Sequence, residues 1–140
     1  MLEVTTAGLF FTVPMTPISK KNSQQILTNP KTGRPFIMPS KKYKQYEKDA
    51  LHFIPKGEVI DFPVNVKCLF YMPTRRQCDL VNMQEAILDV MVKAGLLADD
   101  NYKIVQSMDG SRVLYSKENP RTEVYITEVK GNATQQPDTE

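Results

Sequence analysis

Apolar residues along this chain follow two different spacings, one typical of strands and one typical of helices. Residues 62–72 give the strongest strand signal, because apolar side chains occupy most positions there until Pro73. Residues 9–13 mix β-branched and aromatic side chains before Pro14, which predicts a strand that ends in a turn. Shorter strands are predicted at four further stretches: residues 34–38, 103–108, 113–115 and 122–129.

Turn-forming residues separate the shorter strands. Residues 103–108 and 113–115 flank Asp109, Gly110 and Ser111, so we expect these two strands to pair with each other around that turn. Residues 15–31 look loop-like, and Pro30 and Gly33 suggest a turn at residues 29–33, just before the strand at 34–38. This region resembles a hairpin with basic residues along it.

The first amphipathic stretch predicts a helix from residue 41 to about residue 53. Ser40 precedes it in the position of an N-cap, and Pro55 lies just beyond its end. Tyr43 and Tyr46 recur with other apolar residues at helical spacing. We therefore expect both tyrosines in the core, and stacking on nucleic-acid bases is the alternative role.

The second amphipathic stretch begins after Asp79, a preferred N-cap type, and ends near Gly95. Polar residues gather on one side of this helix, Glu85 and Asp89 among them. The other side should face the core, since its apolar residues recur at roughly 100° per residue. The residues of that core face are Met83, Ala86, Ile87, Val90, Met91 and Ala94.

This succession of elements predicts a single small α+β domain, a mixed β-sheet with two main helices. A chain of 140 residues with 41% hydrophobic residues suits one core. We expect the domain to span residues 1–129. Residues 130–140 have no apolar pattern and predict a disordered C-terminal tail.

Composition excludes several classes of protein. No stretch is long and apolar enough to span a bilayer, and the start of the chain lacks the segments of a signal peptide, so we expect a cytoplasmic protein with no membrane role. Cys68, Cys78 and the single His52 do not have the spacing of a zinc site. We expect both cysteines to be ordinary reduced thiols.

Charge is distributed unevenly although the net charge is only +2. Between residues 20 and 48 basic side chains dominate, whereas between residues 79 and 100 Lys93 is the lone cation. A basic stretch beside an acidic cluster suits a protein that holds a polyanion and positions metal ions on it. The alternative is that the lysines only solvate a surface helix. The basic residues of the first stretch are Lys20, Lys21, Lys31, Arg34, Lys41, Lys42, Lys44 and Lys48.

Carboxylates flank the second helix at both ends. Asp79 precedes it, Asp99 and Asp100 follow it, and Glu85 lies between. If the turns beyond the helix return the chain to one sheet edge, these groups could hold Mg²⁺ or Mn²⁺ against a phosphodiester. The blander interpretation is that Asp79 only caps the helix and that the Asp pair is a solvated turn.

The order of these features resembles the RusA family of Holliday junction resolvases, which are common in bacteriophages and prophages. The shared order is a strand, an arginine-rich loop, Asp-Leu-x-Asn, an amphipathic helix, Lys-Ala-Gly and Asp-Asp. The similarity runs from about residue 11 to residue 129, because segments 34–36 and 40–46 also match. The matching residues around the second helix are Asp79, Leu80, Asn82, Ala86, Asp89, Lys93, Ala94, Gly95, Asp99 and Asp100.

The resemblance implies a homodimeric endonuclease that depends on Mg²⁺ or Mn²⁺, uses no nucleotide cofactor, and nicks two opposed strands of a four-way DNA junction. The family's catalytic carboxylates correspond to Asp79 and to the pair Asp99 and Asp100. Asp100 is then the expected direct metal ligand, and Asp99 a second ligand or a residue that orients it. The alternatives are a DNA-binding protein that keeps the fold without cleavage, and an unrelated α+β protein.

Two positions depart from the family pattern. The family has a second aspartate where this chain has Val81, and a lysine where it has Glu85. Val81 cannot bind a metal. Because Glu85 lies one turn further along nearly the same face, we hypothesise that its longer side chain replaces the missing carboxylate as a catalytic metal ligand.

DNA contacts are expected from a set of basic residues in three segments. Arginines before the acidic helix can hold a phosphate with two parallel hydrogen bonds, and the lysines add contacts that do not depend on sequence. Leu88 and Val92, expected to be exposed, are the candidates for the dimer surface. The expected DNA-binding residues are Lys20, Lys21, Lys41, Lys42, Arg75 and Arg76.

Overall fold

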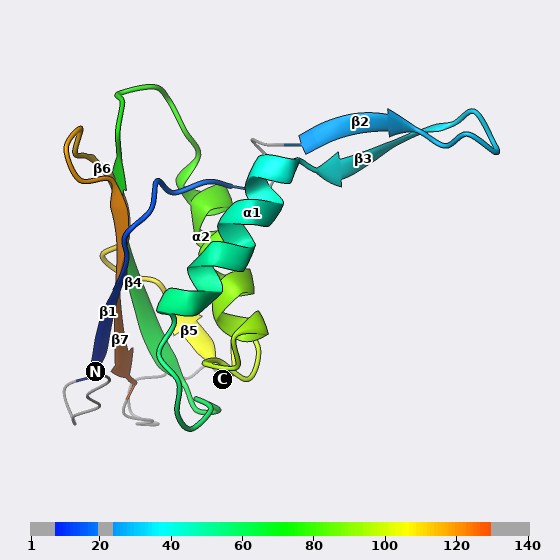
Figure 1. Ribbon diagram of the computed structural model, residues 1–140. Helices are drawn as coiled ribbons and strands as arrows, with labels where there is room; N and C mark the ends of the chain where they lie inside the picture. The colour runs from blue at the N-terminus through cyan, green and yellow to red at the C-terminus, as the bar shows by residue number, and fades with distance from the viewer. Residues whose placement is uncertain (1–7, 20–23, 130–140) are drawn as a thin grey trace, which may run out of the picture.

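A computed structural model describes residues 8–19 and 24–129, and these form a sheet covered on one face by two helices (Figure 1). A hairpin of two strands projects sideways from this body. The arrangement is a small α+β domain with a mixed sheet and two main helices, as the sequence predicts. The strands are β1 (Leu9–Val13), β2 (Gln24–Thr28), β3 (Pro35–Pro39), β4 (Val64–Met72), β5 (Val105–Ser107), β6 (Arg112–Tyr115) and β7 (Arg121–Glu128), and the helices are α1 (Lys41–Ala50), the short 3-10 turn η2 (Leu51–Phe53) and α2 (Leu80–Lys93).

The main sheet is built around β4. Its strand order is β1-β7-β4-β5, and β6 pairs with β4 as well. β7 runs antiparallel to both of its neighbours, while β5 and β6 run parallel to β4. Parallel pairing needs a long crossover connection, and α2 supplies it between β4 and β5.

The predicted pairing of the two short strands with each other is wrong. β5 pairs with the start of β4, and β6 pairs with the end of β4 from Leu69 to Met72. The intervening turn is fixed to β4 by side chains, because the Asn65 Oδ1 accepts from the Asp109 amide at 2.8 Å and the Ser111 Oγ accepts from the Cys68 amide at 2.9 Å. The chain therefore continues along the edge of β4 instead of folding back on itself.

The projecting hairpin corrects the loop expected over residues 15–31. Residues 24–28 form β2, which pairs antiparallel with β3 in register from Gln24 opposite Pro39 to Thr28 opposite Pro35. A tight turn joins the strands, with the Gly33 amide donating to the Asn29 carbonyl at 2.8 Å. Gly33 has a φ of +72°, which glycine adopts without strain.

Both helices begin at the residues that the sequence indicates. The Ser40 hydroxyl accepts from the Tyr43 amide at 3.1 Å, and the Asp79 carboxylate accepts from the Val81 amide at 3.0 Å. Each side chain thus satisfies one of the amides that the first helical turn leaves unpaired. Gly95 follows α2 with a φ of +84°, so the chain turns there.

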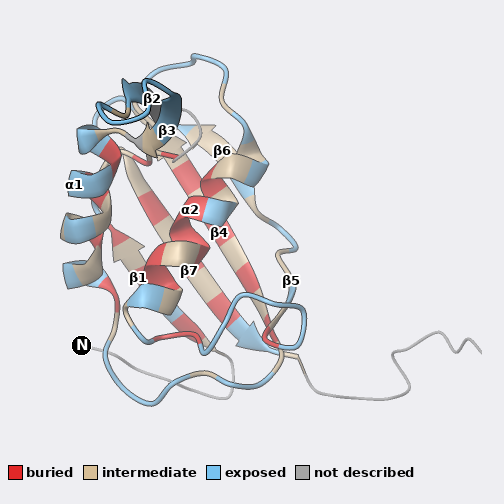
Figure 2. Cartoon of the chain, turned by 90° about the vertical axis from the view of Figure 1, so that its right-hand side faces the viewer, coloured by how far each residue is buried: buried red, intermediate tan, exposed pale blue. Residues whose placement is uncertain are grey.

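The core lies between the helices and the sheet, and buried residues line the inner side of both layers (Figure 2). Tyr43 and Tyr46 are 1% and 4% exposed, so their prediction as core residues is confirmed. Leu88 was expected at the surface but is buried, since the apolar stripe of α2 is wide enough to include it beside Met91. Val92 and Ala94 are only half-buried.

Candidate functional site

A groove of about 1140 Å³ lies where β4 ends and α2 begins. Its walls come from the segment that follows β1, from the start of α1, and from the loop that joins β4 to α2. Lys42 and Arg76 contribute cations to the described part of this lining, and Asp79 contributes a carboxylate. Two cations around an open groove suit a phosphate group, and the carboxylate beside them suits a divalent cation on that phosphate.

Asp79 occupies the rim of the groove and is exposed. One of its oxygens accepts the capping hydrogen bond from Val81, and a carboxylate has further lone pairs that can accept another ligand. The positive end of the α2 dipole stabilises negative charge at this position. The structure therefore shows that Asp79 caps α2, and its exposed carboxylate still has lone pairs with which it could bind a metal ion.

A second acidic group lies beyond the other end of α2. The Asp99 carboxylate accepts from the Asp100 amide at 2.7 Å and from the Asn101 side-chain amide at 2.9 Å, and these bonds hold the pKa of Asp99 below its usual value. The pKa of Asp100 is raised instead, first by partial desolvation, then by the hydrogen bond and charge of Asp99, and also by the charge of Asp89. Negative charge is thus concentrated around Asp100.

The two acidic groups lie beyond opposite ends of one helix, since Asp79 caps the start of α2 and Asp99 and Asp100 follow its last residue, Lys93. α2 has 14 residues and is about 21 Å long, with Asp79 at its start and with Asp99 and Asp100 in the turn beyond its end. Among residues 8–19 and 24–129, no three His, Cys, Asp or Glu side chains are grouped closely enough to hold a metal ion. A single chain does not bring the predicted ligands together, and the turn beyond α2 does not return to the groove as the sequence argument supposed.

Glu85 lies on an exposed part of α2, between these two groups. Val81, one turn earlier, is 58% exposed, so the aspartate that the family pattern has there would face solvent or a partner. Glu85 and Val81 share one side of the helix, which agrees with the spacing that motivated the compensation hypothesis. The metal-binding roles of Asp79, Glu85 and Asp100 remain predictions.

The predicted DNA-binding residues divide into three groups. Lys42 and Arg76 line the groove, and Lys41 is exposed at the start of α1 beside it. The Arg75 guanidinium instead lies 4.0 Å from the centre of the Tyr115 ring. A cation over an aromatic face is held in place by the ring quadrupole, so Arg75 is positioned at the end of the sheet. Lys20 and Lys21 lie outside the described residues.

Two features of this region were missed by sequence reasoning. The first is the groove wall formed by residues 16–19, where Ser19 is 1% exposed. The second is Tyr115, which the sequence presents only as the end of a short strand. No local sequence pattern marks the groove wall or Tyr115, because their positions depend on how the segments of β1 and β6 meet the loop that follows β4.

The described helices offer no candidate for a bilayer crossing, since none of them combines the necessary length with sufficient apolar character.

Comparison with known proteins identifies the family of this chain. The family profile of the endodeoxyribonuclease RusA matches residues 14–127. The chain is 33% identical over 88 residues to the crossover junction endodeoxyribonuclease RusA of Aquifex aeolicus (strain VF5), a match that covers 61% of this chain and 66% of that protein.

A phage relative and a bacterial relative give shorter matches. The crossover junction endodeoxyribonuclease rusA of Enterobacteria phage 82 is 36% identical over 70 residues, and the RusA protein of Escherichia coli (strain K12) is 34% identical over 70 residues. Each of these matches covers 44% of this chain and 58% of the relative. The chain thus spans somewhat less than two thirds of the curated relatives it matches. Because the family profile covers most of the sequence, the chain belongs to the endodeoxyribonuclease RusA family.

Proposed function

We propose that this protein is a cytoplasmic, structure-selective endodeoxyribonuclease that binds four-way and related branched DNA and nicks two opposed strands. The observation that supports it most is the groove at the start of α2, where Lys42 and Arg76 face the same space as Asp79. Its relatives are named crossover junction endodeoxyribonucleases, which fits a phosphodiester as the group bound there.

Each residue of the groove would have a distinct task. Arg76 would hold a backbone phosphate through its planar guanidinium, and Lys42 would add a point charge on the same strand. These contacts would recognise the DNA backbone and would not distinguish base sequences, so selectivity would come from the shape of the branched DNA. Asp79 would stand beside the bound phosphate at the helix end, where its charge is stabilised.

The residue types around α2 suit a hard cation, since Mg²⁺ and Mn²⁺ prefer carboxylate oxygens. Asp79, Glu85 and Asp100 would hold the ion. Bound there, it would supply an activated water and stabilise the charge that develops on the phosphate. Asp99 would position Asp100, because its carboxylate already accepts the Asp100 amide.

In a dimer, Asp79 and Asp100 from different copies of the chain could lie close together. If two α2 helices pack antiparallel about a two-fold axis, the start of each helix lies next to the end of the other. Asp79 of one protomer would then approach Asp100 of its partner, and the pair would contain two such sites. A dimer of this kind also meets the demand of paired nicking, which requires two active sites related by symmetry.

A second function is favoured by Val81. This residue is 58% exposed where the family pattern has an aspartate, and a valine cannot coordinate a metal. A protein that binds branched DNA without cutting it would keep the cationic groove and lose that carboxylate.

An end-labelled synthetic four-way junction tests both functions. The protein would be incubated with the junction in Mg²⁺, in Mn²⁺ and in EDTA, with linear duplex as the substrate control. Metal-dependent paired nicks that disappear in Asp100→Asn would support the nuclease. Tight junction binding without nicks in either metal would support the binding protein, and equal binding to junction and duplex would contradict both.

Mixing two inactive variants tests the shared site. Asp79→Asn and Asp100→Asn would each be inactive alone, but a mixed dimer contains one site in which both aspartates are intact. We expect mixing to restore roughly a quarter of the wild-type nicking, since about half of the dimers are mixed and each has one working site. A site built within one chain predicts no recovery.

A further inference from the structure

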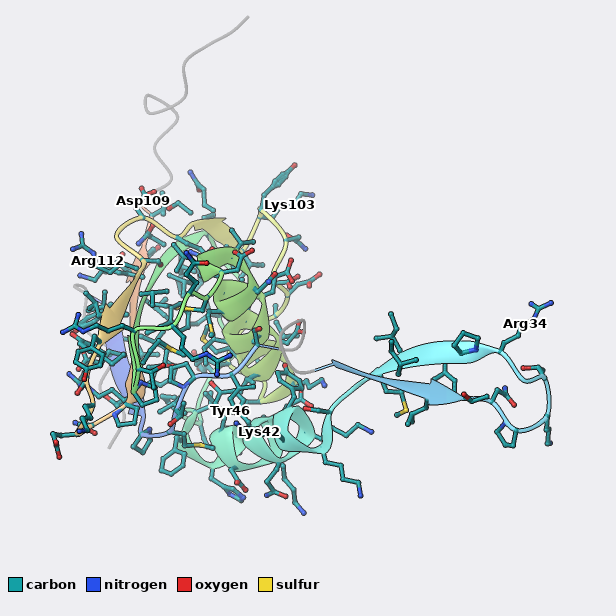
Figure 3. All side chains as sticks on the ribbon, turned by 90° about the horizontal axis from the view of Figure 1, so that it is seen from above. Arg34, Lys42, Tyr46, Lys103, Asp109 and Arg112 are labelled. Atoms are coloured by element: carbon teal, nitrogen blue, oxygen red, sulfur yellow. The ribbon has the colours of Figure 1, made fainter. Side chains whose placement is uncertain are left out.

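The hairpin of β2 and β3 extends away from the body (Figures 1 and 3), and apolar side chains are exposed on both of its faces. Ile26 and Ile37 face each other across the two strands and are 72% and 62% exposed. The next pair, Leu27 and Phe36, faces the opposite side and is 38% and 40% exposed. An isolated two-stranded hairpin is only marginally stable in water, and exposed apolar patches mark interaction sites. We therefore expect another surface to pack against these four side chains.

The charge of the hairpin limits what can cover it. Between residues 24 and 39 the charged residues are Lys31 and Arg34, both near the tip, and none is acidic. Arg34 lies at the far end, distant from the body (Figure 3). A fitting surface therefore offers apolar area beneath the middle of the hairpin and negative charge beneath its tip.

This same chain presents such a surface at the far end of α2. Tyr102 is 69% exposed there, next to Asp99 and Asp100, which are also exposed. Within one copy, however, this end of α2 lies opposite the hairpin (Figures 1 and 2), so only another copy can bring the two together.

The dimensions of the hairpin suit contact with a second copy. Each strand has five residues and is about 17 Å long, which exceeds the width of a helix, about 10–12 Å. The hairpin leaves the body at the start of α1 and projects on the side of the sheet on which both helices lie (Figures 1 and 2). A copy whose α2 runs antiparallel beneath it would present Asp99 and Tyr102 toward the hairpin, while its Asp100 faces Asp79 in the proposed metal site.

We propose that the hairpin of residues 24–39 is a dimerisation arm that packs across a second copy of this chain, over the end of its α2. The two arms are exchanged reciprocally, so the contact is closed and leaves no unfilled surface for a third copy. The inference rests on the proposed pairing of two protomers and goes beyond it by assigning the segment that holds them together. DNA is the less fitting partner, because the middle of the arm is apolar and its cations are confined to the tip.

The test uses a double variant, Ile26→Thr with Ile37→Thr. Threonine is β-branched and keeps the preference for strand, while it removes apolar contact from the arm. Phe10→Thr is the matched control: Phe10 is 52% exposed, and alternation along β1 directs it away from the helices. Sedimentation equilibrium on the full chain would measure the dimer dissociation constant of all three proteins.

We expect the double variant to dimerise at least about tenfold more weakly than wild type, since it loses apolar area that the contact would remove from water. The Phe10→Thr protein should keep the wild-type constant. An unchanged constant in the double variant would refute the arm. Unchanged dimerisation with weakened junction binding would also refute it and would assign the arm to DNA. A wild-type protein that stays monomeric at all concentrations would refute the pairing itself.

A measurement on wild-type protein guards against misfolding of the variant. Hydrogen exchange of the amides in β2 and β3 should be slow when the protein is concentrated and should accelerate on dilution below the dimer dissociation constant. Amides of β4 should show no such change, because their bonds lie within one chain. Arm amides that exchange equally fast at both concentrations would overturn the proposal.

Discussion

Replacing Asp79 in two different ways separates its structural role from its proposed chemical role. Its carboxylate caps α2 through the bond from the Val81 amide at 3.0 Å. Asparagine is as good a cap as aspartate, but it has no negative charge and is a poor ligand for Mg²⁺. Alanine removes both the cap and the charge. Asp79→Asn should therefore keep the fold and lose cleavage, and Asp79→Ala should lose both stability and cleavage.

The size of each effect follows from the geometry at the helix end. Loss of a capping side chain costs about 1 kcal/mol, which for a chain of this length lowers the Tm by about 3–5 °C. In Asp79→Asn only the interaction with the helix dipole is lost, about 0.3–1 kcal/mol at an exposed position. Loss of a metal ligand removes several kcal/mol of transition-state stabilisation, so nicking should fall at least about a hundredfold in both variants.

Calorimetry and the junction-cleavage assay, run on the same preparations, measure both quantities. Wild-type nicking by Asp79→Asn would refute the metal role and leave Asp79 as a cap alone. If Asp79→Asn and Asp79→Ala lost equal stability, the capping argument would be refuted. Junction binding by Asp79→Asn should be retained, because Lys42 and Arg76 are unchanged.

Three further predictions address other parts of the chain. Glu85→Ala should abolish metal-dependent nicking of the junction, and normal nicking by this variant would show that Glu85 does not replace the carboxylate missing at Val81. A thiol reagent at pH 8 should label Cys78 and spare Cys68 until the protein unfolds. The reason is that Cys68 is fully buried, and burial raises the pKa of its thiol to about 12. Labelling of both thiols in the native protein would contradict this prediction. Gly110→Ala should lower the free energy of unfolding, measured by urea titration, by about 1 kcal/mol or more. Gly110 has a φ of +89°, and the added Cβ would lie 2.7 Å from the Lys67 side chain. An unchanged urea midpoint would show that the turn adjusts to the extra atom without cost.

Local signals in the sequence were sufficient for the helices and the central strand. Ser40 and Asp79 mark helix starts because their side chains bond amides only two or three residues away. Tyr43 and Tyr46 could be assigned to the core because helical spacing alone puts them on the apolar side. These features depend on neighbours within a few residues, which a sequence pattern records.

Features that depend on distant partners were not predictable in this way. The turn between β5 and β6 looks like that of a hairpin, but Asn65, more than forty residues earlier, bonds to it and holds both strands on β4. The same limit applies to the acidic cluster. Asp79 and Asp100 lie within about twenty residues of each other in the sequence, yet the 14 residues of α2 lie between them in one chain.

The position of β7 in the sheet has a consequence for the synthesis of this protein. β7 lies between β1 and β4, so the first described strand finds its partner only when the last described strand has been made. At roughly 5–20 residues per second, β1 waits on the order of ten seconds for residues about 110 positions later. From the time that β4 is made until β7 follows, β4 has an open edge where β7 will bind, and nascent chains on neighbouring ribosomes present the same edge. We therefore expect the yield of active protein to depend on chaperones during translation more than on the stability of the folded protein.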